Sequence, residues 1–316
     1  MNLAQNSDSS AAPLFRIGTR GSDLALWQAH TIQGKLNDLG YETAIEIIKT
    51  RGDRIDNVPF SELEGKNFFT KELEDAQLEG RVDLAVHSLK DLATESIPGL
   101  VLTAMVGRED PRDALLVHKE AVDQARHEAG ETLPLKDGAK IGTGAARRQA
   151  MLRFLRPDLE IADLRGNVPT RVNRLREGMY DAILLAQAGI KRLELDLSDL
   201  YVKPLPVDEF VPAPAQGMLG IQCRDESEWT MHLAKLDCPD AGRAVAVERE
   251  ILKNLEGGCQ LPFGINITPA DGALKLECFL AEADNSREPL RLSKVGSDLD
   301  ALKAEAWNEI QAYRGA

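Results

Sequence analysis

The sequence predicts an α/β fold of two similar lobes, followed by a smaller α+β C-terminal domain. Three observations support this prediction. The chain has 316 residues, which is more than one compact domain usually holds. One pattern of strand, glycine-containing turn and helix occurs twice, and alternating strands with a closing helix follow from about residue 240. We therefore expect a first lobe of residues 13–110 and 216–236, a second lobe of 111–215 and a C-terminal domain of 237–316.

The first lobe opens with a predicted strand, turn and helix in "LFRIGTRGSDLALWQAHTIQGKLNDLG". Ser22 or Asp23 can cap this helix and Gly40 can end it. "YETAIEIIKT" alternates like a second strand, "TKELEDAQLEG" predicts a helix, and "RVDLAVHSLKDL" predicts a buried strand that runs into a turn. The polar stretch "GDRIDNVPFSELEGKNFF" predicts a long loop of the kind that often serves as a lid.

The second lobe repeats this plan. "AKIGTGAARRQAMLRFLRPDL" again predicts a strand, a turn and a helix, and "REGMYDAILLAQAGIKRL" parallels "LEGRVDLAVHSLKDL". Common ancestry and chance similarity both stay open, but two such units in series predict two lobes with a cleft between them. The prolines and glycines of "KPLPVDEFVPAPAQGMLGIQCR" predict a hinge that returns the chain to the first lobe.

The C-terminal domain begins with a predicted helix and turn in "AGRAVAVEREILKNLEGGCQLPFG". Strand-like alternation follows in "INITPADGALKLECFLAE", and a closing helix is predicted around "LDALKAEAWNEIQAY". Cys259 lies in the turn, after two glycines and shortly before a proline. It is either a buried, unreactive thiol or an accessible thiol in a loop, and the glycine and proline neighbours favour the loop.

The composition argues against several classes of protein. A formal charge of −13 argues against a general nucleic-acid binder, whose footprint is basic. No apolar run approaches the roughly 18 residues of a transmembrane helix, and the N-terminus lacks the basic start and apolar stretch of a signal peptide. Four scattered cysteines and five histidines form no metal-ligand motif, so the sequence predicts no metal site and favours reduced thiols in a cytoplasm.

Arginines at the predicted strand-to-helix turns are the main functional signal. They are Arg20 in the first lobe and Arg147, Arg148, Arg165, Arg171 and Arg192 in the second. Helix N-termini favour anions, and arginine adds bidentate donors for carboxylate or phosphate. Any one of them alone reads as a solvated surface residue, but the set predicts a ligand with several negative charges. Because the chain has no phosphate-binding glycine motif, carboxylates are favoured over a nucleotide.

A lysine and an aspartate follow the buried strand of the first lobe, where "HSLKDL" contains Lys90 and Asp91. Ligands of α/β proteins bind where strands end, so this turn is well placed for function. A carboxylate there could orient an N–H donor, stabilise a cation or shuttle protons. The structural alternative is a helix-capping aspartate beside a solvated lysine.

Nine segments occur in order between about residues 15 and 265: "IGTRGSDLALWQAH", "KTRGD", "GKNFFTKELEDAQLEGRVDLAVHSLKDL", "REDPRDALL", "IGTGAARRQAML", "DLRGNVPTRV", "YDAILLAQAGIKRL", "PAPAQGMLGIQCR" and "LEGGCQLPFG". Together they resemble the porphobilinogen deaminase (hydroxymethylbilane synthase) family. The resemblance weakens over roughly the last fifty residues.

This resemblance implies a transferase of tetrapyrrole biosynthesis. Such an enzyme joins four porphobilinogen molecules head to tail, releases ammonia at each step and frees hydroxymethylbilane by hydrolysis. Its two lobes are similar to periplasmic binding proteins, and a cysteine of its third domain carries a dipyrromethane cofactor through a thioether. On this sequence, Cys259 is then the attachment residue and Asp91 the catalytic carboxylate. The family expectation is a cytoplasmic monomer that binds neither nucleic acid nor membrane.

The resemblance also assigns polar residues to the acidic arms of cofactor and substrate. The residues expected to hold the cofactor are Ser88, Lys90, Thr143, Arg147 and Arg148. The residues expected to bind substrate or the growing polypyrrole are Arg20, Ser22, Gln28, Arg165, Arg171 and Arg192, with Lys66 from the lid-like loop.

The sequence departs from the family pattern at three places. The family's second-lobe turn commonly reads Gly-Thr-Ser-Ser before its arginines, whereas residues 143–146 here are Thr-Gly-Ala-Ala. Two hydroxyl donors to the cofactor are therefore missing. Pro169 stands where a glycine is common, and "PAPAQG" replaces the more usual "PAVGQG". Two alternatives stay open: a solute-binding protein that only binds a polycarboxylate, and a homologue with the fold but no turnover. The absent signal peptide, "HSLKD" and "LEGGCQ" argue against the first.

Overall fold

The computed structural model describes residues 14–50, 70–225, 227–256, 261–284 and 286–315. Cys259, Lys66 and the whole predicted lid-like loop lie outside the described residues. No helix in the part of the chain that the structure describes combines the length and apolarity needed to span a bilayer.

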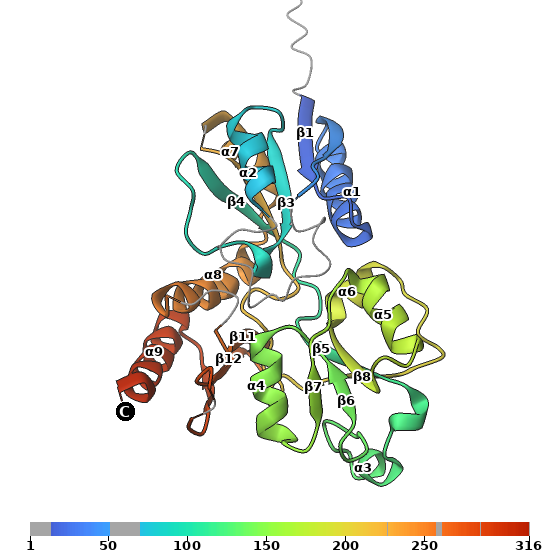
Figure 1. Ribbon diagram of the computed structural model, residues 1–316. Helices are drawn as coiled ribbons and strands as arrows, with labels where there is room; N and C mark the ends of the chain where they lie inside the picture. Colours follow the sequence, from blue (N-terminus) through green and yellow to red (C-terminus); the bar gives the residue numbers. More distant parts are fainter. Residues whose placement is uncertain (1–13, 51–69, 226, 257–260, 285, 316) are drawn as a thin grey trace, which may run out of the picture.

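The first lobe is built on a five-stranded sheet with the strand order β2-β1-β3-β10-β4 (Figure 1). The first three strands along the chain are parallel, and β10 is antiparallel to both of its neighbours. Helices α1 and α7 cover one face, and α2 packs on the other. These elements are β1 (Leu14–Thr19), α1 (Asp23–Asp38), β2 (Glu42–Ile47), α2 (Lys71–Leu78), β3 (Leu84–Ser88), β4 (Leu100–Val106), β10 (Leu219–Arg224) and α7 (Ser227–Leu233).

The second lobe repeats this arrangement with the strand order β7-β6-β8-β5-β9, again with three parallel strands and one antiparallel strand between two neighbours. Helix α4 covers one face, while α5 and α6 cover the other. The two predicted repeats begin at β1 and β6, which occupy equivalent positions, so the prediction of two similar α/β lobes is confirmed. The elements are β5 (Asp113–Val117), α3 (Gln124–Glu128), β6 (Lys140–Gly142), α4 (Ala146–Leu155), β7 (Glu160–Ala162), α5 (Val168–Arg176), β8 (Ala182–Ala186), α6 (Gln187–Arg192) and β9 (Tyr201–Pro204).

Two segments cross between the lobes, residues 107–112 after β4 and residues 205–218 before β10. They touch at Gly217, whose carbonyl accepts a hydrogen bond from Glu109 N at 3.0 Å. Gly217 has φ of +88°, and a Cβ built there would lie 2.2 Å from Glu109 O. Only glycine allows the two crossing segments to approach this closely.

Gly217→Ala should therefore lower the free energy of unfolding by about 2–3 kcal/mol, through steric overlap and a left-handed backbone. Denaturant titration measures this loss. Gly138→Ala is the matched control, because Gly138 has φ of +70° but no atom within 4 Å of its built Cβ. An equal loss in both variants would show that the approach of the two segments is not what requires glycine.

The C-terminal domain is a three-stranded antiparallel sheet, with the order β11-β12-β13. One face packs on α8 and α9, where Ile265, Leu276 and Ile310 are buried together. On the opposite side, Phe279 joins the core of the second lobe. The predicted small α+β domain is confirmed, and its elements are α8 (Pro239–Asn254), β11 (Phe263–Ala270), β12 (Ala273–Leu280), β13 (Leu290–Gly296) and α9 (Leu299–Gly315).

A buried ion pair ties this domain to both crossing segments. Arg108 Nη1 lies 2.8 Å from Glu248 Oε1, and the same carboxylate accepts hydrogen bonds from the backbone N–H groups of Ala215 and Ile267 at 2.8 Å each. Glu248 is 0% exposed. Helix α8 is thus fixed to the point where the lobes are connected.

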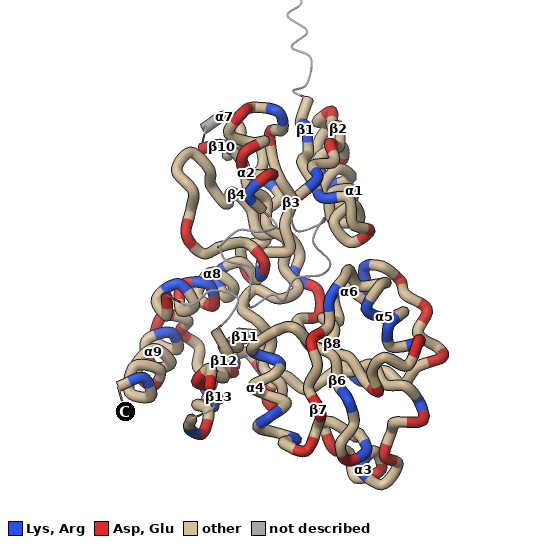
Figure 2. Tube along the Cα trace, in the orientation of Figure 1, with Lys and Arg blue, Asp and Glu red and all other residues tan. Residues whose placement is uncertain are grey.

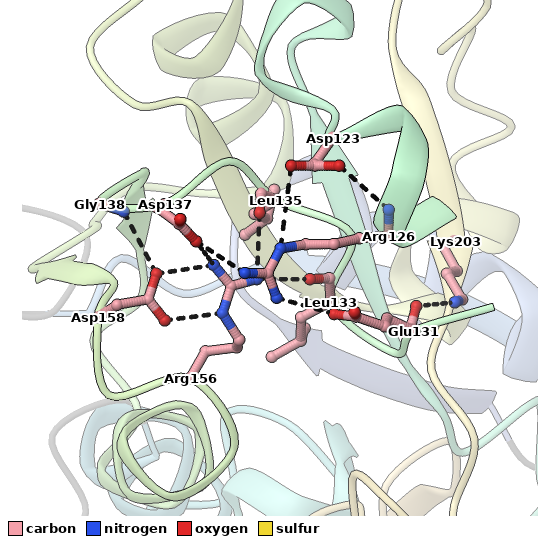
Figure 3. Close-up of polar contacts among 10 residues, drawn as sticks. All are labelled: Asp123, Arg126, Glu131, Leu133, Leu135, Asp137, Gly138, Arg156, Asp158 and Lys203. Atoms are coloured by element: carbon pink, nitrogen blue, oxygen red, sulfur yellow. Dashed lines mark hydrogen bonds and ion pairs between the residues drawn. The ribbon is translucent and has the colours of Figure 1, made fainter. Parts of the chain in front are cut away.

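Charged residues are interspersed along the described chain (Figure 2). Figure 3 shows one network near α3, at the end of the second lobe that is remote from the first. There Arg126 pairs with Asp137 at 2.7 Å, and Arg156 pairs with Asp158 at 2.7 Å while donating to Leu133 O at 2.9 Å. Since these side chains bond to one another and to the backbone, we assign the network to the structure of the lobe.

Candidate active site

The predicted ligand residues of the first lobe lie where its parallel strands end. Arg20 follows β1, Ser88 ends β3, and a 3-10 helix, η3 (Leu89–Asp91), continues directly from β3. Strands β1 and β3 are parallel neighbours, so the segments that carry Arg20 and Asp91 meet at one edge of the sheet. Asp91 is exposed there.

Helix α1 is joined to this edge by polar side chains. Ser22 caps α1, as one of the two predicted caps, and its Oγ accepts a hydrogen bond from Ala25 N at 3.4 Å. Gln28 is 3% exposed and donates through Nε2 to Ser88 Oγ at 2.7 Å. Two predicted ligand residues from different elements are therefore in contact.

A buried carboxylate, Asp113, holds the two arginines at the start of α4. Arg147 Nη1 lies 2.7 Å from Asp113 Oδ2, and Arg148 Nη2 lies 2.7 Å from Asp113 Oδ1. Asp113 is 0% exposed and each arginine only 5%. Burial by itself would raise the pKa of Asp113, but the charges of the two arginines hold that pKa well below its usual range. Asp113 is therefore an anion at neutral pH.

The two guanidinium groups are also held by the backbone. Arg147 donates to Val211 O at 2.6 Å, and Arg148 donates to Leu184 O at 2.9 Å. Burial lowers the pKa of Arg147, with Asp113 opposing this effect. The structure thus brings the two predicted arginines together around an internal counter-charge.

Gln216 links this group to the first lobe. Its Nε2 donates to Asp113 Oδ1 at 3.0 Å and to Pro111 O at 2.7 Å, while its Oε1 accepts a hydrogen bond from Lys90 Nζ at 3.2 Å. Gln216 lies on the second crossing segment and is 1% exposed. Lys90 from one lobe and the arginines of the other are therefore connected through one amide side chain.

Lys90, Asp91, Arg148 and Arg171 interact electrostatically. Burial lowers the pKa of Lys90 to about 8, with Asp91 opposing the shift and Arg148 adding to it. Burial, aided by Arg148 and opposed by Asp91, lowers the pKa of Arg171 to about 10. We call these four residues, with Asp113 and Arg147, the charge cluster. Its four cations outnumber its two carboxylates, which leaves an excess of two positive charges.

Arg165 and Arg171 lie on the loop and helix that follow β7. Arg165 Nε pairs with Asp163 Oδ2 at 2.8 Å, and Arg171 Nε donates to Gly166 O at 2.8 Å. Asn167 caps α5, as its Oδ1 accepts a hydrogen bond from the N–H of the third helical residue at 2.9 Å. These contacts fix the orientation of both arginines.

Asp163 lies close to residue 144, where the sequence departs from the family pattern. A Cβ at Gly144 would lie 2.8 Å from Asp163 Oδ1 and 3.3 Å from Leu164 O. A serine there would displace the carboxylate that pairs with Arg165. The hydroxyl that remains, Thr143 Oγ1, is buried and accepts a hydrogen bond from Ala145 N at 3.3 Å.

Arg192 makes its contacts between the lobes. Its Nη2 donates to Gly217 O at 2.6 Å, and its guanidinium lies over the ring of Trp27, 5.4 Å from the centroid. Burial lowers the pKa of Arg192, with Glu109 opposing the shift. Arg192 therefore bonds the second crossing segment and contacts α1 of the first lobe.

The sequence reasoning missed Asp113 and Gln216 as members of the site. Both lie inside segments that it singled out, "REDPRDALL" and "PAPAQG". The available signal was an aspartate at the start of the apolar stretch "ALLV", since a carboxylate in a buried strand needs a cationic partner.

Comparisons with known proteins support the family resemblance of the sequence segments. The family model "Porphobilinogen deaminase, dipyromethane cofactor binding domain" matches residues 15–232, and "Porphobilinogen deaminase, C-terminal domain" matches residues 243–305. The chain is 43% identical to a porphobilinogen deaminase of Trichlorobacter lovleyi over 92% of this chain and 89% of that protein. It is 44% identical to one from Geobacter sulfurreducens over 86% of this chain and 83% of that protein.

Among solved structures, the periplasmic VFT2 domain of Bordetella pertussis BvgS is similar with a TM-score of 0.42 and 13% identity, over 71% of this chain and 86% of that one. The sequence relatives and the family models confirm the resemblance found in the sequence, including the dipyrromethane cofactor. The chain belongs to the porphobilinogen deaminase family, the transferases of tetrapyrrole biosynthesis that condense porphobilinogen into hydroxymethylbilane.

Proposed function

We propose that Asp91 is the catalytic carboxylate of this enzyme and that the cations of the charge cluster hold the acidic arms of the pyrroles. The observation that carries this proposal is the excess of two positive charges in the charge cluster, one of whose two carboxylates, Asp91, is exposed. Each porphobilinogen unit has an acetate and a propionate arm. An anionic chain of pyrroles would therefore be attracted to the cluster.

Asp91 acts on the part of the substrate that becomes positive. The departure of ammonia from porphobilinogen leaves a cationic carbon conjugated with the pyrrole nitrogen. The carboxylate of Asp91 accepts a hydrogen bond from that N–H and stabilises the positive charge as it develops. The Asp91 side chain is exposed and is proposed to face the reacting unit.

The donor set fits a dipyrromethane, which has four carboxylate arms. These arms would be held by Ser88, Lys90, Thr143, Arg147 and Arg148. The cofactor would supply the anchored pyrrole to which substrate units are added. Asp113 keeps Arg147 and Arg148 in place and offsets one of their two charges. The remaining charge, with that of Lys90, suits an acidic ligand.

A second set of residues is proposed to bind the acidic arms of the incoming substrate and of the growing polypyrrole. These residues are Arg20, Ser22, Gln28, Arg165, Arg171 and Arg192. Support comes from the strand-end positions of Arg20 and Ser22 and from the proximity of Arg171 to Asp91. Lys66 and Cys259 lie outside the described residues and remain predictions from the sequence.

Intact mass tests the cofactor attachment. Protein from a host that makes porphobilinogen should exceed its sequence mass by one dipyrromethane, and Cys259→Ser should not, because serine lacks a thiolate to form the thioether. Cys238→Ser is the matched control, since the structure describes Cys238 as a free thiol, and it should keep the added mass. A wild-type protein of unmodified mass would overturn the proposal.

Lys90 predicts a pH dependence of cofactor loading. Its pKa of about 8 means that it is charged below pH 8 and neutral above it. Affinity for carboxylate arms should therefore fall above pH 8, by up to about tenfold per pH unit. We expect the rate at which cofactor-free protein gains the dipyrrole mass from porphobilinogen to fall in this range. Lys90→Arg should remove the decline, because a guanidinium stays charged, and the same decline in Lys90→Arg would assign it to another group.

The protein is further proposed to be a cytoplasmic monomer with the lobe and domain boundaries stated above. Cys238 and Cys278, two of the cysteines that the structure describes, are free thiols, which suits a reducing compartment. Light scattering after size-exclusion chromatography tests the monomer, and a mass of two chains would contradict it.

A further inference from the structure

The turn that carries Asp91 is bonded to a helix of the C-terminal domain. Arg249, on α8, donates through Nη1 to the carbonyls of Leu89 and Leu92 at 3.0 Å each, and through Nη2 to Ala93 O at 2.8 Å. These three carbonyls lie on both sides of Asp91 in the chain. One side chain from another domain therefore brackets the proposed catalytic carboxylate.

Packing reinforces these bonds. Leu89 and Leu92 are buried in an apolar cluster with Val245, which lies one turn before Arg249 on the same face of α8. At its other end, the turn is held by Leu89 N, which donates to Met218 O at 3.0 Å. The backbone on either side of Asp91 is fixed, while the Asp91 side chain stays exposed.

The turn itself provides few bonds of its own. Helix η3 has three residues, and its internal hydrogen bond, from Leu92 N to Leu89 O, is 3.3 Å long. The carbonyls at its end have no further turn of helix to accept from. The guanidinium of Arg249 satisfies them with a planar, multiply donating group, which a lysine could not match.

Helix α8 links this turn to two other parts of the molecule. The residue before Arg249, Glu248, binds Arg108 and the second crossing segment. The helix ends at Asn254, five residues before Cys259, the predicted attachment residue. Figure 1 shows α8 running beneath the first lobe, between that lobe and α9.

We propose that Arg249 is a positioning residue, which sets the location of Asp91 relative to the helix that leads to the cofactor attachment segment. This inference rests on the proposed catalytic role of Asp91. Without the three bonds, the turn would be free to shift and would carry Asp91 with it. A displacement of about 1 Å is enough to reduce the rate by about 10²-fold. The family assignment by itself gives Arg249 no role.

The test is a double-mutant cycle on kcat, with rates divided by the cofactor-loaded fraction from intact mass. Arg249→Ala should reduce kcat by about 10- to 100-fold with KM within about threefold. In an Asp91→Glu background, whose carboxylate is already displaced by one methylene, Arg249→Ala should cost less than about threefold. Equal costs in both backgrounds would mean that Arg249 does not act through Asp91 and would overturn the proposal.

A second readout does not depend on activity. Amide hydrogen exchange of the segment 86–96 should accelerate in Arg249→Ala, while exchange in the sheet of the second lobe stays unchanged. Arg243→Ala is the matched control, because Arg243 lies on the same helix with its side chain 78% exposed. It should change neither exchange nor kcat.

Two further outcomes are decisive. If Arg249→Ala does not fold, Arg249→Lys replaces it. Exchange at 86–96 should then be faster in Arg249→Lys than in the wild type, because an ammonium cannot reach all three carbonyls. Unchanged exchange in the tested variant would refute positioning. Near-normal kcat in Asp91→Ala would instead refute the role of Asp91, so the two failures are distinguishable.

Discussion

Replacing Asp91 with alanine is expected to reduce kcat by about 10³-fold while leaving the protein folded. Asp91 is exposed on a three-residue helix, so its side chain contributes little to the packing of the lobe. In the proposed reaction, its carboxylate faces the charge that develops as ammonia leaves, and alanine offers nothing in its place. Steady-state turnover, divided by the cofactor-loaded fraction, measures the loss.

Two controls separate charge from shape. Asp91→Asn keeps the size of the side chain without its negative charge, and it should lose nearly as much activity as alanine. Asp240→Ala removes a carboxylate that is fully exposed at the start of α8, and kcat should stay within about twofold. Turnover of Asp91→Ala close to that of the wild type would refute the catalytic role.

Elements with local signals were predictable from the sequence. Helix α1 begins after Ser22, which accepts the capping hydrogen bond, and it ends shortly before Gly40. The apolar run before Ser88 became the buried strand β3. In each case, the cap, the periodicity and the terminating residue lie within about twenty residues of one another, so a single window of sequence contains them all.

The partners of the site residues were not predictable in this way. Asp113 at the start of β5 meets Arg148 on α4, 35 residues further along the chain, and no local motif encodes this contact. Arg192 bonds Gly217 O on the second crossing segment, 25 residues further along the chain. Such contacts depend on the topology of the fold. The residues were visible in the sequence, but which of them pair with one another was not.

Removal of the charge of Asp113 should destabilise the protein strongly. In Asp113→Asn, two buried guanidinium groups lose their shared counter-charge, and we expect the free energy of unfolding to fall by about 3–5 kcal/mol. Because the folded protein depresses the pKa of Asp113, this stabilisation is full above the unfolded-state pKa of about 4 and is lost as the pH falls below it. Urea titrations between about pH 3 and 7 should therefore show the gap between wild type and variant closing toward low pH.

Asp110→Asn is the matched control for this loss. Asp110 also pairs with an arginine, at 2.7 Å, but that pair lies at the surface and should contribute less than about 1 kcal/mol. A comparable loss in both variants would mean that burial of the arginine pair is not what makes Asp113 important.

The Asp113→Asn variant also tests whether Arg147 and Arg148 bind the cofactor. If the acidic arms of the dipyrromethane reach these arginines, the bound cofactor supplies negative charge that Asp113→Asn lacks. The difference in stability between wild type and Asp113→Asn should then be smaller in cofactor-loaded protein than in cofactor-free protein. If the difference is the same in both forms, the arms do not reach the two arginines, and Asp113 serves the fold alone. If wild type and Asp113→Asn differ less in stability when the cofactor is bound, the guanidinium groups of Arg147 and Arg148 pair with Asp113 and also bind the acidic arms of the cofactor.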